Sequence, residues 1–243
     1  MITTAGAQEK TALPGATYES IKTLPDWSGW WGLEGPLSAE FQRVRPPLKP
    51  QLMESFYKTL ASDVGGFRDL YCRPNEFTGY SGGFVESIEF LFTPARVTLT
   101  SESGLIRRIY TDGRSLPKDV DFTTTGTSVG HWEGQTLVVE TVGIDPKALY
   151  PQLTPAAIAI GRNAQVTERI FLSNPETLHE VTTVAPDILA APDKRTRVYS
   201  RVHRSAALQI SFCANHDRAV DPRTGKQRFD MTPPPDLPPP PAH

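Results

Sequence analysis

Short stretches in which apolar and polar residues alternate dominate the chain after residue 82, and they limit its fold more than any other feature. Alternation with a period of two is the pattern of a β-strand that buries one face. Such stretches occur at residues 84–92, 96–101, 105–111, 125–132, 136–142, 165–172, 178–184, 197–204 and 208–213. Their succession predicts a mainly β, antiparallel fold that is closed or nearly closed into a barrel, with a sandwich as the alternative.

Tight-turn sequences separate several of these expected strands. An Asp-Gly pair at 112–113 ends one strand, and a Glu-Gly pair at 133–134 joins two others into a hairpin. The longer connection at 146–161 predicts a short helix near 154–160 that could lie over one end of the barrel. An antiparallel closed barrel of about eight strands has room inside for one small ligand.

One amphipathic helix is expected before the strands. Apolar residues recur at helical spacing within 51–62, and a Gly-Gly pair at 65–66 ends the segment. The residues up to about position 25 carry no periodicity and predict a flexible arm. Trp27, Trp30 and Trp31 then predict a segment that packs on the outside of the core, with the lining of a ligand site as the alternative.

Proline distribution divides the chain into a core and two ends. Proline accounts for 23 of the 243 residues, about twice the usual frequency, and is frequent near both ends. Residues 1–45 are therefore expected to form an N-terminal arm, 46–220 the barrel domain with its helix, and 221–243 a Pro-rich tail. A chain of this length can form one domain with a substantial core.

Charge and hydropathy argue against a nucleic-acid-binding protein and against a transmembrane helix. The formal net charge is −2, without the basic excess of a nucleic-acid-binding protein. The sequence contains no run of about 18 apolar residues, the length that would predict a transmembrane helix. The small-x-small sequence at 5–7 has the form of a signal-peptidase site. It favours an exported chain, periplasmic or secreted, with a disordered cytosolic N-terminus as the alternative.

The two cysteines, Cys72 and Cys213, are far apart in the sequence. No zinc-site spacing surrounds them. In an exported protein we expect one disulfide that joins the start of the core to its last strand, with two buried free thiols as the alternative. Closing so long a loop would stabilise the fold by about 4–5 kcal/mol in the chain-entropy model.

Strand alternation places two carboxylates on otherwise apolar faces. Glu168 and Glu140 each share an expected face with branched aliphatic residues. Burial raises the pKa of an unpaired carboxyl group towards the range useful for a general base, and two such groups could form an acid–base pair. The alternatives are an outer face, or a buried ion pair with Arg108 or Arg169.

The neighbouring strands supply further candidates. His131 precedes a tight turn and could transfer a proton near neutral pH, with a strand-end histidine bonded to backbone as the alternative. Tyr110 could present its phenol to a cavity. Arg169 or Arg108 would then fix an anionic group, and Trp132 would contact the substrate. The histidines on expected strands show no metal-ligand spacing, so no metal and no cofactor are expected.

Arg197, Tyr199 and Arg201 share one face of a later expected strand. An alternating basic face of this kind could bind a carboxylate or a phenolate. A solvated outer face is the favoured interpretation.

Several motifs occur in a specific order along the chain. They are Cys72-x-Pro, EFLFTP at 89–94, RRIYTDGR at 107–114, GTSVGHWEGQTLVVET at 126–141, TER at 167–169 and FCAN at 212–215. Together they resemble a large family of exported, largely uncharacterised bacterial proteins, over roughly residues 46–220. The resemblance implies export, a Cys72–Cys213 pair and a lipocalin-like β-barrel, and it implies no particular reaction. The segment at 75–80 departs from the Gly-Met-Pro-like segment of that family.

These observations support three functional hypotheses. The first is a cofactor-independent lyase, isomerase or cyclase that acts on a small apolar or aromatic metabolite in the barrel, with Glu168 as the base, His131 or Tyr110 as the acid, and Glu140 as a further carboxylate. The second is a periplasmic carrier that binds a hydrophobic ligand without converting it. The third is an envelope-associated structural protein. A homodimer is compatible with each of them.

Overall fold

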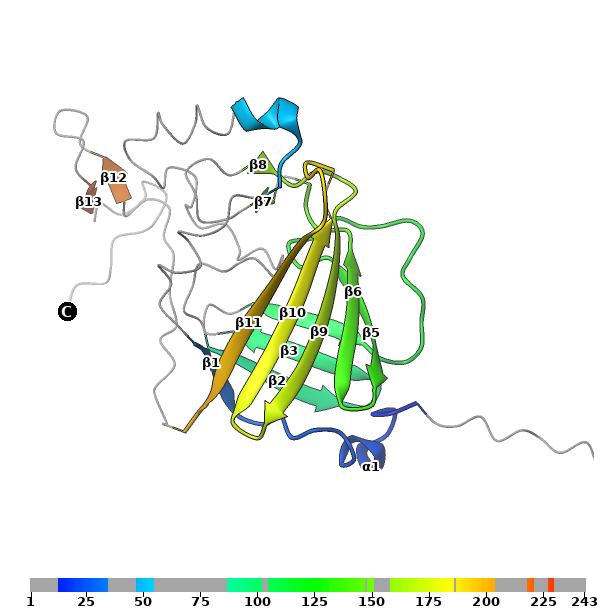
Figure 1. Cartoon of the computed structure of the whole chain (residues 1–243). Coiled ribbons are helices and arrows are strands. Elements are labelled where there is room, and N and C mark those ends of the chain that lie inside the picture. The colour runs from blue at the N-terminus through cyan, green and yellow to red at the C-terminus, as the bar shows by residue number, and fades with distance from the viewer. Residues whose placement is uncertain are drawn as a thin grey trace, which may run out of the picture.

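The computed structural model describes residues 13–34, 47–54, 87–101, 105–146, 148–150, 158–185, 187–203, 218–220 and 227–229. Within these residues the chain is mainly β, and its central feature is a closed barrel (Figure 1). The mainly β barrel predicted from strand alternation is therefore confirmed.

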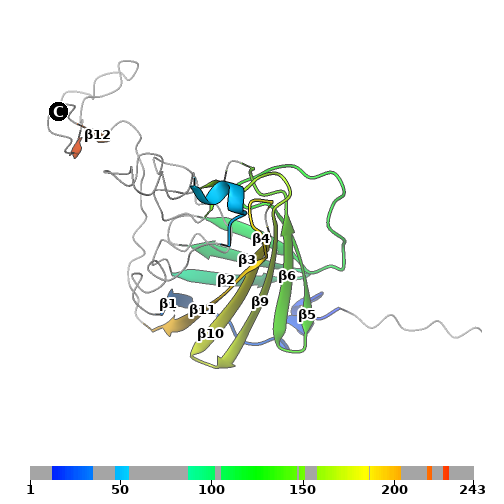
Figure 2. The ribbon, with the colours of Figure 1, turned by 45° about the horizontal axis from the view of Figure 1, so that its top comes forward.

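Nine strands close the barrel in the order β1-β11-β10-β9-β6-β5-β4-β3-β2, with β2 paired back to β1. Figure 2 shows β2 to β4 crossing behind β9 to β11, as expected for a twisted, closed sheet. The strand bounds are β1 Trp30–Leu33, β2 Ile88–Thr93, β3 Arg96–Ser101, β4 Ile106–Tyr110, β5 Thr127–Glu133, β6 Thr136–Val142, β9 Gln165–Asn174, β10 Thr177–Ala185 and β11 Asp193–Val202.

Neighbouring strands of the barrel pair antiparallel except at one place. β4 and β5 run parallel and share a short ladder, Ile109 opposite Ser128 and Tyr110 opposite Val129. Parallel neighbours cannot be joined by a tight hairpin, so β4 and β5 are joined by the long connection 111–126. This one parallel pair departs from the antiparallel pairing expected from the sequence, because alternation specifies strands and faces but not the direction of pairing.

The N-terminal region contributes directly to the barrel. β1 lies in the segment expected to be an arm outside the core, and it closes the sheet between β11 and β2. Trp27 and Trp31 are 1% and 0% exposed and belong to an apolar cluster of the interior, so their expected packing is confirmed. The expected position of their segment outside the core is wrong, because β1 is a strand of the barrel itself. A four-residue strand has too little alternation to be recognised locally.

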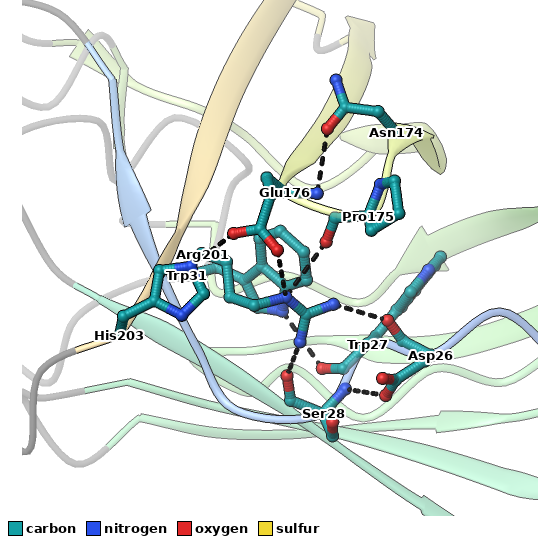
Figure 3. A network of polar contacts seen from close by, with 9 residues as sticks. All are labelled: Asp26, Trp27, Ser28, Trp31, Asn174, Pro175, Glu176, Arg201 and His203. Atoms are coloured by element: carbon teal, nitrogen blue, oxygen red, sulfur yellow. Dashed lines mark hydrogen bonds and ion pairs between the residues drawn. The ribbon is translucent and has the colours of Figure 1, made fainter.

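Arg201 ties β1 to the rest of the barrel, as Figure 3 shows. Its guanidinium donates hydrogen bonds to the backbone carbonyls of Asp26 (2.9 Å), Ser28 and Pro175 (3.0 Å). The same group lies 4.4 Å from the centre of the Trp31 ring, a cation–π contact. One side chain thus joins the entry to β1 with the turn between β9 and β10.

Helices are few in the described residues. α1 (Tyr18–Ile21) begins at a capping box in which Thr17 and Ser20 satisfy each other's backbone N–H groups, within the segment expected to be an unstructured arm. Residues 50–54 are helical and begin the helix expected over 51–62, whose remainder lies outside the described residues. The expected helix at 154–160 is wrong at its end, where β8 (Ile158–Ala159) pairs with β7 (Leu149–Tyr150).

Two apolar clusters occupy opposite ends of the barrel, and Figure 1 shows α1 near one end and the helical segment 50–54 near the other. The first surrounds Trp27, Trp31 and Phe90, and the second surrounds Ile144, Ile160 and Leu189. Residues of both clusters occur on the inward faces of β9 and β10. The polar inward positions on these strands lie between them.

Several expectations fall partly or wholly outside the described residues. These include the strand at 208–213, Cys72 and Cys213. In the expected C-terminal tail, β13 (Gln227–Phe229) pairs with β12 (Arg218–Val220) as a separate two-stranded sheet. Among the described residues, no helix has both the length and the apolar composition needed to cross a membrane.

Candidate functional site: a charged layer inside the barrel

The middle of the barrel contains a layer of polar side chains between the two apolar clusters. Each residue occupies an inward position of its strand, so alternation alone directs it away from solvent. We call this set the polar layer, and its members are Arg107, Ser128, Thr141, Glu168, Glu180, Thr182, Arg197 and Tyr199. None of them is more than 8% exposed.

An ion pair between Arg107 and Glu168 forms one side of the polar layer. The guanidinium donates from Nη1 to Oε1 of Glu168 at 2.9 Å, and Nη2 contacts Oε2. Nη2 also donates to the Thr141 hydroxyl at 2.7 Å and Nε to the Ser128 hydroxyl at 3.0 Å. With exposures of 1% and 0%, this pair is sealed from water, and its geometry is bidentate.

A second carboxylate, Glu180, forms the other side of the polar layer. The Tyr199 hydroxyl donates to Oε2 of Glu180 at 2.9 Å, and Nη1 of Arg197 lies 3.8 Å from the same oxygen. Thr182 donates to Oε1 at 3.3 Å. Glu180 stands diagonally across the β9–β10 ladder from Glu168, because Thr182 is the residue directly opposite Glu168. Two carboxylates therefore share the interior.

Burial raises the pKa of Glu180 from 4.5 to about 7. The positive charge of Arg197 opposes this rise, and the neighbouring Glu168 adds to it. The pKa of Tyr199 lies well above its usual value of 10.0, first because of burial and then because of the charge of Glu180. Near neutral pH, Glu180 can thus gain or lose a proton while Tyr199 remains a phenol.

The two carboxylates have different chemical capacities. Glu168 is held by two contacts to one guanidinium, so its charge is neutralised in place. Glu180 accepts hydrogen bonds from the neutral Tyr199 phenol and the Thr182 hydroxyl, and its contact to the Arg197 guanidinium is longer, at 3.8 Å. A buried carboxyl group that titrates near neutral pH is suited to general acid–base catalysis. Glu180, with Tyr199 beside it, is the reactive part of the layer.

The inward position predicted for Glu168 is confirmed, since it is 0% exposed beside Val166 and Ile170. Its guanidinium partner is Arg107 rather than Arg108 or Arg169. Glu140 does not join it. The inward face of β6 carries Leu137, Val139 and Thr141, which leaves Glu140 exposed, so the inward face expected for Glu140 is wrong.

The other residues proposed from the sequence lie away from the polar layer. His131 is on the surface, with its side chain 63% exposed, and contacts Glu133 at 3.3 Å. Arg169 pairs with the same glutamate at 2.8 Å. Arg108 is exposed, and Tyr110 lies under the Arg114 guanidinium, 4.0 Å from its ring centre. The structure therefore does not bring His131 or Tyr110 to Glu168.

Trp132 points inward, unlike the surface residues of its hairpin. It packs against Trp27 and Phe92 in the apolar cluster at the end of the barrel that carries α1. It belongs to that aromatic cluster, separate from the polar layer.

Of the eight residues of the polar layer, sequence reasoning favoured only Glu168 as a site residue. The expected strand at 105–111 has two faces, and the one that turns inward contains Arg107 and Ile109. The basic face of β11 was expected to be solvated, but Arg197 and Tyr199 are 8% and 6% exposed. Glu180 alternates with Leu178 and Val184, so the test that identified Glu168 could have found it.

No protein-family model matches the chain, and no curated protein is significantly similar to it in sequence. In the described part of the chain, no group of three or more histidine, cysteine, aspartate or glutamate side chains could hold a metal ion.

Proposed function

We propose that this protein is a cofactor-independent acid–base enzyme, a lyase, isomerase or cyclase, that acts on a small apolar or aromatic metabolite within the barrel. The observation that carries the proposal is Glu180, a buried carboxyl group with a pKa of about 7 and a phenol hydrogen bond. Enzymes raise carboxyl pKa values by burial in this way to transfer protons near neutral pH.

In this proposal Glu180 accepts a proton from the substrate. The Tyr199 hydroxyl then donates a hydrogen bond to the negative charge that develops on the substrate. Glu168, held in position by Arg107, is not the base in this proposal, and its negative charge helps to raise the pKa of Glu180. Arg197 adds a positive charge that favours a substrate with an acidic or enolisable group.

The leading alternative is a carrier that binds its ligand without converting it. The aromatic cluster at the end of the barrel suits the apolar part of such a ligand. The polar layer makes a wholly hydrophobic ligand costly, because charged groups would lose their polar environment on its binding. A carrier would therefore select a ligand with at least one polar group. An envelope-associated structural protein would need no ligand at all.

The decisive experiment compares the wild-type protein with Glu180→Gln on a panel of small aromatic metabolites in D2O. Conversion and deuterium incorporation are followed by proton NMR, and binding by tryptophan fluorescence. We expect wild-type protein to convert at least one compound and Glu180→Gln to lose about 10²–10⁴-fold in rate while still binding it. Glu140→Gln, which removes an exposed carboxylate, is the matched control and should retain full activity.

Each outcome separates the hypotheses. Binding without conversion in both proteins would favour the carrier, and no binding of any compound would favour the structural role. Conversion that survives in Glu180→Gln would exclude this residue as the base.

We further propose that the protein is exported and that Cys72 and Cys213 form a disulfide. The support is the small-x-small sequence at 5–7, the position of the two cysteines and the motif resemblance. Mass spectrometry of the alkylated protein, with and without reduction, tests the pair directly. Alkylation of both thiols in the unreduced protein would contradict it.

A further inference from the structure

The barrel end next to α1 is closed by four aromatic side chains, Trp27, Phe90, Phe92 and Trp132, which we call the aromatic end. Ring centres lie 4.9 Å apart for Trp27 and Phe90, and 5.4 Å apart for Trp27 and Trp132. The ring of Phe92 is 5.8 Å from that of Trp132. The cluster comes from three separate elements, since Phe90 and Phe92 lie on β2, Trp132 on β5, and Trp27 before β1.

Two polar atoms of the aromatic end are buried without a hydrogen-bond partner. They are the indole nitrogens of Trp27 and Trp132, and neither has an acceptor among the described residues. The neighbouring Trp31 differs, because its indole N–H donates to the Trp27 carbonyl at 3.1 Å. In Figure 3 the Trp27 indole points away from Arg201, with its nitrogen at the far end of the ring.

Unpartnered buried donors are rare and costly, because the group has lost its water without gaining another acceptor. On adjoining rings, these are two donors that one bound acceptor could satisfy. A carbonyl oxygen has two lone pairs and can accept from both donors. The four rings provide no countercharge, so a neutral carbonyl is favoured over a carboxylate, whose unpaired burial is much more costly.

The N-terminal residues 13–26, which we call the strap, cover this end of the barrel. A side-chain atom added at Gly15 would lie 3.7 Å from the Trp132 indole nitrogen, so the strap passes close to this donor. The Gly15 carbonyl accepts a hydrogen bond from the Ala95 backbone N–H at 2.8 Å. α1, which lies in the strap, has no buried residue, so this part of the strap can move at little cost in buried apolar surface.

We propose that the aromatic end binds a small, neutral aromatic carbonyl compound beneath the strap, with the indole N–H groups of Trp27 and Trp132 donating to its oxygen. The rings of the aromatic end contact the aromatic part of the ligand. Displacement of the strap provides the route of entry. This site is separate from the polar layer and does not depend on Glu180.

Nitrogen–proton correlation NMR of the full chain tests the proposal, because the protein has four tryptophans and so four indole N–H signals. Acetophenone is the probe, and α-methylstyrene, which has the same shape but a methylene group in place of the oxygen, is the control ligand. We expect acetophenone to move the Trp27 and Trp132 signals downfield. The signal of half-buried Trp30, which lies outside the aromatic end, should stay in place.

Phenylalanine variants measure the contribution of each donor. Trp132→Phe keeps an aromatic ring but removes the N–H, so we expect acetophenone to bind about fivefold more weakly and α-methylstyrene to bind as before. Trp30→Phe is the matched control and should bind both compounds as the wild-type protein does.

Two results would overturn the proposal: no movement of either signal with acetophenone, or equal movement with both compounds. Both are read from the wild-type protein, so the test holds even if a variant does not fold.

Discussion

At the scale of single residues, the polar layer stabilises the fold only while its members stay paired. Removing both charges from water is costly, and the bidentate geometry with two hydroxyl acceptors offsets that cost for Arg107 and Glu168. Loss of one partner leaves the other charge buried without compensation. The intact pair therefore adds little net stability, but each member is needed to compensate the buried charge of the other.

We expect Arg107→Met to lower the free energy of unfolding by about 3–5 kcal/mol, because Glu168 would be left unpaired at 0% exposure. The double variant Arg107→Met/Glu168→Leu should recover most of this loss, since no buried charge remains. Urea unfolding measures both. Equal destabilisation by the single and double variants would show that packing, and not the unpaired charge, sets the cost.

The raised pKa of Glu180 predicts a pH dependence of stability. Below pH 4.5 the carboxyl is protonated in both the folded and the unfolded chain, so it contributes no difference. Between pH 4.5 and about 7 the unfolded chain loses this proton while the folded one keeps it. The contribution of Glu180 to the free energy of unfolding therefore falls by about 3 kcal/mol across this interval.

Glu180→Gln removes this titration. Relative to wild-type protein, the variant should become progressively more stable as the pH rises from 4.5 to 7, with no further change above that range. Urea unfolding at several pH values measures the difference. A difference that is the same at pH 5 and pH 8 would mean that the pKa of Glu180 is not raised.

At the scale of elements, the parallel β4–β5 pair depends on close backbone approach near the crossover connection. Gly143 follows β6 with a φ of +72°, and a Cβ there would lie 2.2 Å from Cγ1 of Val120 and 2.7 Å from the Asp121 carbonyl oxygen. Only glycine allows this contact without displacing the connection. The crossover therefore lies against the end of β6.

Gly143→Ala is expected to cost about 3 kcal/mol or more, from the left-handed backbone and the clash together. Gly134→Ala is the matched control, because Gly134 has a φ of +60° but nothing within 4 Å of its added Cβ. Its cost should be about 1 kcal/mol. Thermal or urea unfolding measures both, and equal costs would mean that the crossover yields readily to the added methyl group.

At the scale of the whole molecule, closure of the barrel depends on the short strand β1. Its ladder with β2 has only the pairs Trp30–Glu89 and Trp31–Ile88, whereas its ladder with β11 is longer. On the other side of β1, the Arg201 guanidinium of β11 donates to the carbonyls of Asp26 and Ser28 at the entry to β1 and contacts the Trp31 ring. A short strand with only two pairs to β2, held on its β11 side partly by one long side chain, is suited to local opening.

We expect Arg201→Lys to accelerate hydrogen exchange of the β1 amides at least tenfold, because a lysine keeps the charge but cannot donate to three carbonyls in a fixed fork. Amides of β9 and β10, which form the longest ladder of the barrel, should exchange as in wild-type protein. Exchange accelerated equally in all strands would indicate global destabilisation instead of local release of β1.

Local sequence predicted most of the barrel but little of its closure. The expected strand at 96–101 coincides with β3, and the turn after Glu133 joins β5 to β6. Both depend on alternation and turn chemistry, which act over a few residues. The parallel pair and β1 were missed, because the direction of pairing and the closing of a seam depend on contacts between residues distant in sequence.

By itself, the sequence determined the positions of eight of the nine barrel strands and the face that Glu168 shares with Val166 and Ile170, since a period of two directs each side chain to one face. Only the tertiary structure decided which inward residues meet. Arg107 and Glu168 are separated by 61 residues in sequence, and Glu180 and Tyr199 by 19, yet each pair is in contact. The physical reason is that strand order and register position these side chains relative to one another across the closed barrel, and neither is encoded in any short stretch of the chain.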